Sequence, residues 1–382
     1  MENNRETAAW CALNRVFGYE PMLGRRLAEA FGGAEAVFSQ REEILREALG
    51  PRAELAERLR EDTLRSAEED LERTREEGGR FLPLGSGDYP ELLAECPDPP
   101  LGLYFRGDSS PAEVFGFRPC IAFVGTRDAS PYGREWCRRL VGALEGAGTP
   151  PVIVSGLAFG IDGIAHATAL ECGLPTVGVM ATGLDNVYPW QHRELARRIV
   201  RSPGSALVTD YPRGSAPLAL NFIRRNRIIA GLSRAVIVIE SKSKGGSLIT
   251  ARYANEYDRD VYALPGRADD PRSRGCNSLI RYRMADLLLS PEDLADRLGL
   301  QGRRRTATED LRAALERRYG PGSAPVRLGL SVKEHRGITR EELARITGIP
   351  LREVLPAVVT LESDGFIVTD LLGRCSILAK NR

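Results

Sequence analysis

The sequence predicts an α/β protein built around a doubly wound, mostly parallel sheet. Short runs rich in Val and Ile alternate with helical segments between residues 81 and 298. This alternation is typical of parallel strands that are covered by helices on both faces. On either side of this stretch the pattern changes: residues 1–80 have helical spacing, and residues 325–382 combine two helices with a hairpin. We therefore expect a small helical N-terminal module and a C-terminal winged helix.

The N-terminal segment is rich in Ala, Leu, Glu and Arg. Leu23, Leu27, Ala30 and Phe31 recur at helical spacing, and the glycine pair that follows predicts a helix end and a turn. Residues 54–77 form a charged helix for which we expect a solvated face. The module is thus predicted to be a packing or spacing element.

The central segment contains six apolar runs that predict buried strands. They cover residues 120–124, 152–154, 176–180, 206–208, 235–239 and 261–264. In an open parallel sheet, ligands bind beyond the carboxyl ends of the strands. The turns that follow these runs are therefore the places where a binding site is expected.

The C-terminal part begins with a predicted linker, residues 299–324, which includes a helical piece around residues 311–318. Thr339 and Glu342 have the spacing of a capping box at the start of a short helix. A second helix is expected to end near Ser363, and residues 366–369 and 375–378 form a hairpin. This order is that of a winged helix over residues 325–382.

Composition limits the classes of function. Lys and Arg total 53 against 52 acidic residues, so a nucleic-acid contact must come from a local patch. Seven scattered cysteines without a C-x-x-C motif predict reduced thiols and a cytoplasmic location. Three histidines leave little for a metal site or a catalytic triad, and no apolar run is long enough for a membrane span. We expect no metal, no cofactor and no catalytic residue.

An Arg-rich segment, residues 222–233, together with three turns that follow predicted strands, suits single-stranded nucleic acid. Guanidinium groups donate to phosphate oxygens, an aromatic ring stacks on a base, and glycine-rich turns present backbone N–H groups to anions. The alternatives are arginines that pair with acids of their own domain and a Phe222 that belongs to the core. The predicted nucleic-acid-binding residues are Gly125, Thr126, Arg127, Gly156, Phe222, Arg224, Arg225, Asn226, Arg227, Lys244, Gly246 and Ser247.

Asp162 and His166 lie four residues apart and would share a helix face, which is compatible with acid–base work. No nucleophile accompanies them. We therefore favour a structural role in which they orient the loop and the start of the helix.

Several motifs in this order resemble the DNA-processing protein A family, also called DprA or Smf. They are Phe123-Val-Gly-Thr-Arg127, Ser155-Gly-Leu-Ala-Phe-Gly-Ile-Asp162, Arg225-Asn-Arg-Ile-Ile-Ala-Gly-Leu-Ser233, Gly246-Ser-Leu-Ile-Thr-Ala251 and Leu264-Pro-Gly266. The resemblance covers roughly residues 81–290. It extends more weakly to the family's helical N-terminal module, of the SAM or helix-hairpin-helix kind, and to its winged helix.

The resemblance implies a non-enzymatic protein that binds single-stranded DNA on an extended Rossmann-like domain and dimerises through it. It also implies protection of incoming DNA and loading of the recombinase RecA in natural transformation, with single-strand-binding protein as a further partner. By motif position, Gly125 and Arg127 belong to the family's DNA-contacting turn, and Phe222 is its base-contacting aromatic residue. Arg224, Arg225 and Arg227 would line the same pocket.

The chain departs from the family pattern at three places. Phe159 stands where the family often has a basic residue, Ile223 where it usually has proline, and Arg283-Met284 where Gly-Ala is common. The first change is expected to weaken a phosphate contact, and the second to loosen the backbone before the Arg cluster.

Two other functions remain open from the sequence. Residues 245–250 loosely resemble the P-G-G-x-G-T-x-x-E motif of phosphoribohydrolases, but Lys244 replaces the proline and Tyr253 stands in place of the catalytic Glu. Alternatively, the winged helix would read duplex DNA as a regulator. Its second helix offers Arg352 but also Glu353, whereas base reading usually needs several Arg, Lys, Asn or Gln.

Overall fold

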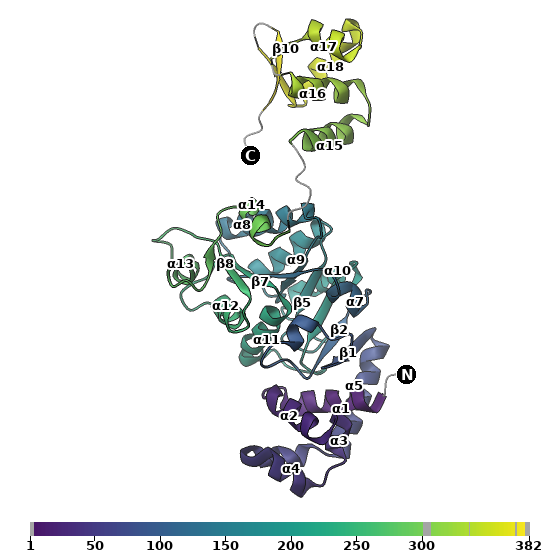
Figure 1. Ribbon diagram of the computed structural model, residues 1–382, viewed down its shortest axis with the longest axis vertical. Coiled ribbons are helices and arrows are strands. Elements are labelled where there is room, and N and C mark those ends of the chain that lie inside the picture. Colours follow the sequence, from purple (N-terminus) through teal and green to yellow (C-terminus); the bar gives the residue numbers. More distant parts are fainter. Residues whose placement is uncertain (1–3, 301–306, 336, 371–372, 379–382) are drawn as a thin grey trace. The chain divides into compact units, whose positions relative to one another are not determined.

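The computed structural model describes residues 4–300, 307–335, 337–370 and 373–378, which belong to two compact units (Figure 1). One unit lies within residues 1–302 and the other within residues 303–382. The predicted fold class is confirmed: a large, mostly parallel sheet with helices on both faces is preceded by helices and followed by a winged helix.

The N-terminal helices pack on one face of the sheet as well as on each other. Leu13 and Phe17 share a hydrophobic core with Tyr104 and Leu207 of the sheet. The predicted turn is confirmed, since α2 ends at Phe31 and is followed by a glycine in the left-handed region. The elements are α1 (Asn4–Phe17), α2 (Pro21–Phe31), α3 (Ala34–Phe38), α4 (Glu42–Leu49), the 3-10 helix η1 (Gly50–Arg58) and α5 (Glu61–Glu76).

The sheet has nine strands in the order β1-β2-β6-β5-β4-β3-β7-β8-β9. The six predicted strands are confirmed as β3 (Cys120–Val124), β4 (Val152–Ser155), β5 (Thr176–Val179), β6 (Ala206–Thr209), β7 (Ala235–Val238) and β8 (Asp260–Ala263). Three strands were not predicted: β1 (Gly79–Pro83) and β2 (Gly102–Arg106), which add antiparallel pairs at one edge, and β9 (Asp286–Leu287) at the other.

The strand order reverses at β3. From β3 the chain moves outward through β4, β5 and β6, and it then returns to pair β7 with the other side of β3. Such a reversal leaves a crevice beyond the carboxyl ends of the two strands, because the helices that follow them lie on opposite faces.

Two layers of helices cover the sheet. One core contains Val154, Val236, Ile229 and Ala251 on the side of α11 and α12, and another contains Phe123, Ile153 and Leu140 on the side of α8 and α9. The helices are α6 (Glu91–Ala94), α7 (Pro111–Phe115), α8 (Pro131–Ala143), η2 (Leu144–Gly146), α9 (Ile161–Glu171), η3 (Trp190–His192), α10 (Arg193–Arg201), α11 (Ala219–Leu232), α12 (Gly246–Glu256), α13 (Arg274–Arg281) and α14 (Pro291–Arg297).

The second unit is a winged helix with its own core. The predicted capping box at Thr339 and Glu342 is present, with both reciprocal hydrogen bonds. The helical piece predicted within the linker is α15, and its Leu315 is fully buried in this core. The elements are α15 (Ala307–Tyr319), α16 (Ala324–Glu334), β10 (Ile338–Thr339), α17 (Arg340–Thr347), α18 (Leu351–Ser363), β11 (Ile367–Thr369) and β12 (Arg374–Ile377).

Candidate nucleic-acid interface

A groove of about 740 Å³ lies beyond the carboxyl ends of β3 and β7, where the strand order reverses. We call it the β3/β7 groove. Its walls come from the turn after β3, the loop before α9, one face of α11 and the start of α12. The predicted residues that line it are Gly125, Thr126, Arg127, Phe222, Arg225, Asn226, Lys244, Gly246 and Ser247.

Arg127 and Phe222 meet at the mouth of this groove. The Arg127 guanidinium lies 5.0 Å from the centroid of the Phe222 ring, and the Tyr188 ring meets Phe222 edge-on at 5.4 Å. Phe222 is half-buried and Tyr188 is 46% exposed. Tyr188 also lines the groove and was not among the predicted residues. The two rings and the cation form a partly open surface on which a base can stack.

Arg225 forms the floor of the groove and is almost completely buried. Its Nη1 donates to the carbonyl oxygens of Gly156, at 2.5 Å, and Val179. Burial lowers the pKa of Arg225 to about 10, against the opposing effect of the Asp162 carboxylate, so the guanidinium stays charged at neutral pH. Arg225 therefore contributes positive potential to the groove, while its Nη1 is engaged by backbone carbonyls of its own unit.

Gly156 acts through Arg225 rather than as part of the groove wall. A Cβ atom at this position would lie 2.6 Å from the guanidinium of Arg225. The glycine thus allows the close approach that seats Arg225, and it does not line the groove.

Arg224 and Arg227 do not face the groove, which corrects the expectation that the three arginines share one pocket. The segment is helical, so residues 224 and 227 share a face that Arg225 does not. Arg224 donates to Gly18 O at 2.7 Å and lies 4.3 Å from the Tyr19 ring centroid. Arg227 is buried in an ion pair with Asp210 at 3.0 Å. Both arginine side chains therefore contact residues of their own unit.

The start of α12 supplies the opposite wall of the groove. Lys242 and Lys244 are exposed there, and no acidic partner lies within ion-pair distance of either in the described part of the chain. The first-turn amides of a helix are not used within the helix and bind anions. Ser247 is not a helix cap, because its hydroxyl donates to Ser241 Oγ at 2.9 Å. Asn226 donates to Gly246 O at 3.3 Å and joins α11 to this wall.

Asp162 and His166 have structural roles. Asp162 accepts the Gly156 N–H at 3.2 Å, and burial raises the pKa of this carboxyl. His166 is fully buried, with its Nδ1 2.7 Å from Thr176 Oγ1. Because the Thr176 hydroxyl donates to Ile153 O, the histidine Nδ1 carries the proton and donates to Thr176. Neither arrangement presents a free acid or base to the groove.

Glu240 was missed by the sequence reasoning. It lies two residues after the end of β7, is buried, and accepts the Ser130 N–H at 2.9 Å, which holds the start of α8 against the sheet. A Cβ on Gly133 would lie 2.5 Å from its Oε2. An acidic residue directly after a Val/Ile run was the available signal.

Comparison with known proteins gives a consistent result. The model of the DNA recombination-mediator protein A family matches residues 80–299. Protein Smf of Synechocystis is 40% identical over 298 residues, which cover 78% of this chain and 73% of that protein. The chain belongs to this family. Its role is therefore in DNA processing and recombination.

Two solved structures of the DNA recombination-mediator protein A family are similar to this chain. DNA processing protein A of Streptococcus pneumoniae has 31% identity and a TM-score of 0.64, with 74% of this chain and 95% of that chain covered. DNA processing protein A of Helicobacter pylori, whose single-stranded DNA binding mode has been described, has 28% identity, a TM-score of 0.50 and coverage of 57% and 95%.

No helix in the described residues is long and apolar enough to span a bilayer. Within the same ranges, no group of His, Cys, Asp and Glu side chains has the arrangement of a metal site.

Proposed function

We propose that the β3/β7 groove binds single-stranded DNA. The observation that carries the proposal is the Arg127–Phe222 pair, a cation and a partly open ring at the mouth of a groove whose other wall has two exposed lysines. Arg127, Lys242, Lys244 and the first amides of α12 contact phosphates, and a base stacks on Phe222. The relative from Helicobacter pylori, which binds single-stranded DNA, supports this choice of ligand.

The proposed activity is binding without catalysis. Among the described residues that line the groove, Asp162 is the one carboxylate, and it is committed to the Gly156 N–H. A phosphoribohydrolase needs an acid that moves a proton at the substrate. Incubation with nucleoside monophosphates should therefore release no free base.

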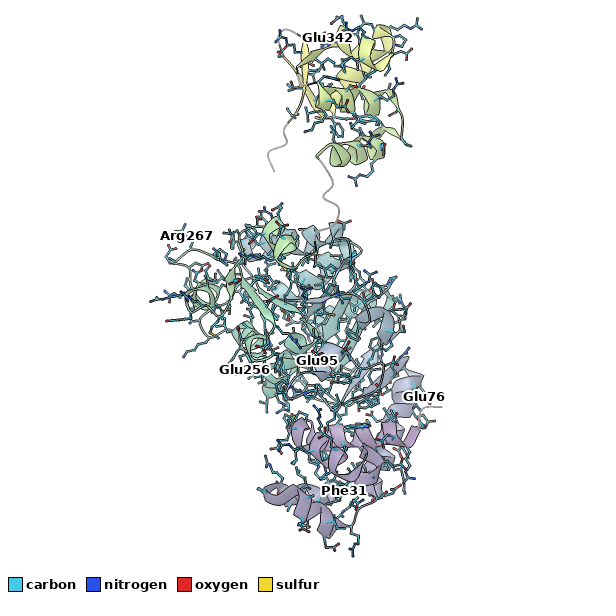
Figure 2. All side chains as sticks on the ribbon, in the orientation of Figure 1. Phe31, Glu76, Glu95, Glu256, Arg267 and Glu342 are labelled. Atoms are coloured by element: carbon cyan, nitrogen blue, oxygen red, sulfur yellow. The ribbon has the colours of Figure 1, made fainter. Side chains whose placement is uncertain are left out.

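Fluorescence anisotropy with single-stranded and duplex DNA at several salt concentrations tests the groove. We expect preference for the single strand, and Arg127→Ala should reduce the log–log salt slope by about 0.7, the value of one lost phosphate contact. Arg224→Ala should leave the slope unchanged because its guanidinium binds Gly18 and Tyr19. Arg267 is a matched control, since it projects from the loop between β8 and α13 (Figure 2). Equal salt slopes for Arg127→Ala and Arg267→Ala would show that Arg127 makes no phosphate contact.

We also propose the cellular role that the family resemblance implies. The chain acts in the cytoplasm as a homodimer, protects incoming DNA and loads RecA onto strands coated by single-strand-binding protein. Membership in a recombination-mediator family supports this role. The test is whether the protein accelerates RecA filament formation on coated strands, and equal filament formation with and without it would exclude loading.

A further inference from the structure

A second cavity, of about 510 Å³, lies between α8 and α9, which pack side by side (Figure 1). We call it the α8–α9 pocket. Arg127 lines both this pocket and the β3/β7 groove, so the two adjoin at this side chain. The other residues that decide its chemistry are Arg134, Arg138, Phe159 and His192.

The lining of the pocket contains more cationic than acidic side chains. Arg134 and Arg138 lie four residues apart on α8, and both are exposed. Within the described ranges, neither has a carboxylate at ion-pair distance, and Arg134 is oriented by donation to Ala129 O at 2.8 Å. The lining contains two acidic residues, Asp128 and Glu171, and Asp128 is paired with Arg272 at 3.0 Å. Arginines at this spacing present their donors to one phosphate or to two adjacent ones.

Phe159 offers an aromatic face at the same pocket. Its side chain is 42% exposed, and its ring meets His192 edge-on at 5.2 Å. The His192 ring is fixed in turn, because Nδ1 donates to Leu157 O at 2.9 Å. A Cβ on Gly163 would lie 2.7 Å from His192 Cε1, so this glycine makes room for the ring.

The backbone that carries Phe159 is also constrained. Gly160 has φ +74°, and a Cβ there would collide with Thr126 O. The Ile161 N–H donates to the same carbonyl at 3.2 Å, which ties this turn to the one that bears Arg127. An exposed ring held on such a turn is a preformed surface for stacking, since little conformational entropy is lost when a base binds.

We propose that the α8–α9 pocket is a second nucleotide subsite, in which the DNA strand that leaves the β3/β7 groove at Arg127 stacks a base on Phe159 and places phosphate on Arg134 and Arg138. The proposal rests on the proposed function of the groove.

A series of oligothymidylates of about 4 to 16 nucleotides tests the extension, because the shortest fill only the groove and the longest reach the pocket. In the Arg134→Ala/Arg138→Ala double variant, the dissociation constant for the longest oligonucleotide should rise roughly ten-fold, and the salt slope for that oligonucleotide should fall by about 1.4. The shortest oligonucleotide should bind the double variant as tightly as it binds the wild type. Phe159→Ala should weaken binding of the longest about five-fold or more. Phe159→Arg should raise its salt slope by about 0.7.

Arg139→Ala is the matched control, since Arg139 lies on the same helix but pairs with Glu135 and covers Trp136. Arg139→Ala should leave the dissociation constant and the salt slope unchanged for oligonucleotides of every length. If the Arg134→Ala/Arg138→Ala variant binds oligonucleotides of every length as this control does, the proposed pocket is wrong. If Arg127→Ala still weakens binding in that case, the proposed groove stands. If the unaltered protein binds no oligonucleotide, the groove and the pocket both fail.

Discussion

The Phe222 ring is engaged on two sides before any ligand arrives, by the Arg127 cation and by the Tyr188 ring edge. A base that stacks on Phe222 competes with these contacts or adds to them, depending on which face it takes. The ring is neither fully in the core nor fully free, so the two interpretations of its sequence position each describe part of it.

Phe222→Ala should therefore weaken single-strand binding by about 1–3 kcal/mol through loss of stacking. Phe117→Ala is a close control, because Phe117 is an exposed ring with the Arg118 guanidinium 5.0 Å from its centroid, and it lies outside the groove. Anisotropy titrations together with thermal melts measure both effects. A lower melting temperature with unchanged affinity would make Phe222 a packing residue.

His166 gives the folded protein a defined response to acid. Burial, with smaller effects of His192 and Arg225, lowers the pKa of His166 from 6.5 to about 3. Between these values the unfolded chain binds a proton that the native state does not, so stability is full above pH 6.5 and falls as the pH decreases toward 3. At pH 5 the loss from this group is about 2 kcal/mol, at roughly 1.4 kcal/mol per unit.

Urea unfolding of wild type and His166→Leu across pH 7 to about pH 5 measures this contribution. The variant should lose less stability on acidification than the wild type, and His335→Gln, at an exposed position, should behave like the wild type. Parallel pH profiles for wild type and His166→Leu would contradict the assignment.

At the scale of elements, the central strands were predictable because each is buried on both faces and reads as a continuous Val/Ile run. Two of the added strands lacked this signal: β9 has two residues, and β1 ends in a proline. The sequence showed the cluster of arginines, but the directions of their side chains depend on the helical phase of α11 and on the elements that pack against this helix. Partners distant in sequence, such as Gly18 for Arg224 and Asp210 for Arg227, cannot be identified from local spacing.

The free edge at β9 is a second element with a consequence. Tyr282, Met284, Leu287 and Leu289 are exposed around it, and among the strands of the described residues β9 pairs with β8 alone. An apolar sheet edge of this kind is suited to a second copy of the chain. For the proposed homodimer, Leu289→Asp should therefore shift the mass measured by light scattering from dimer toward monomer, while Leu220→Asp, at another exposed apolar position, should not. A dimer that persists in Leu289→Asp would direct the search to a different surface.

At the scale of the whole molecule, both proposed binding sites, the β3/β7 groove and the α8–α9 pocket, lie in the first unit. The winged helix presents Leu351, Leu355 and Val359 as exposed side chains along α18. Four-residue spacing puts these apolar groups on one face, which does not offer the hydrogen bonds needed to read base edges. The acidic residues in the sequence of α18 already argued against the reading of duplex DNA by this helix.

The division of the hydrophobic cores has a calorimetric consequence. Leu13 and Phe17 of the first helix share a core with Tyr104 and Leu207, whereas the core described for Leu315 to Cys375 is built from residues of the second unit. Heat should therefore melt the N-terminal helices together with the sheet in one cooperative endotherm, and the C-terminal unit in another. Leu343→Ala should move only the second of these peaks to lower temperature. Saturating oligonucleotide should move only the first to higher temperature, since a ligand raises the melting point of the body that holds it.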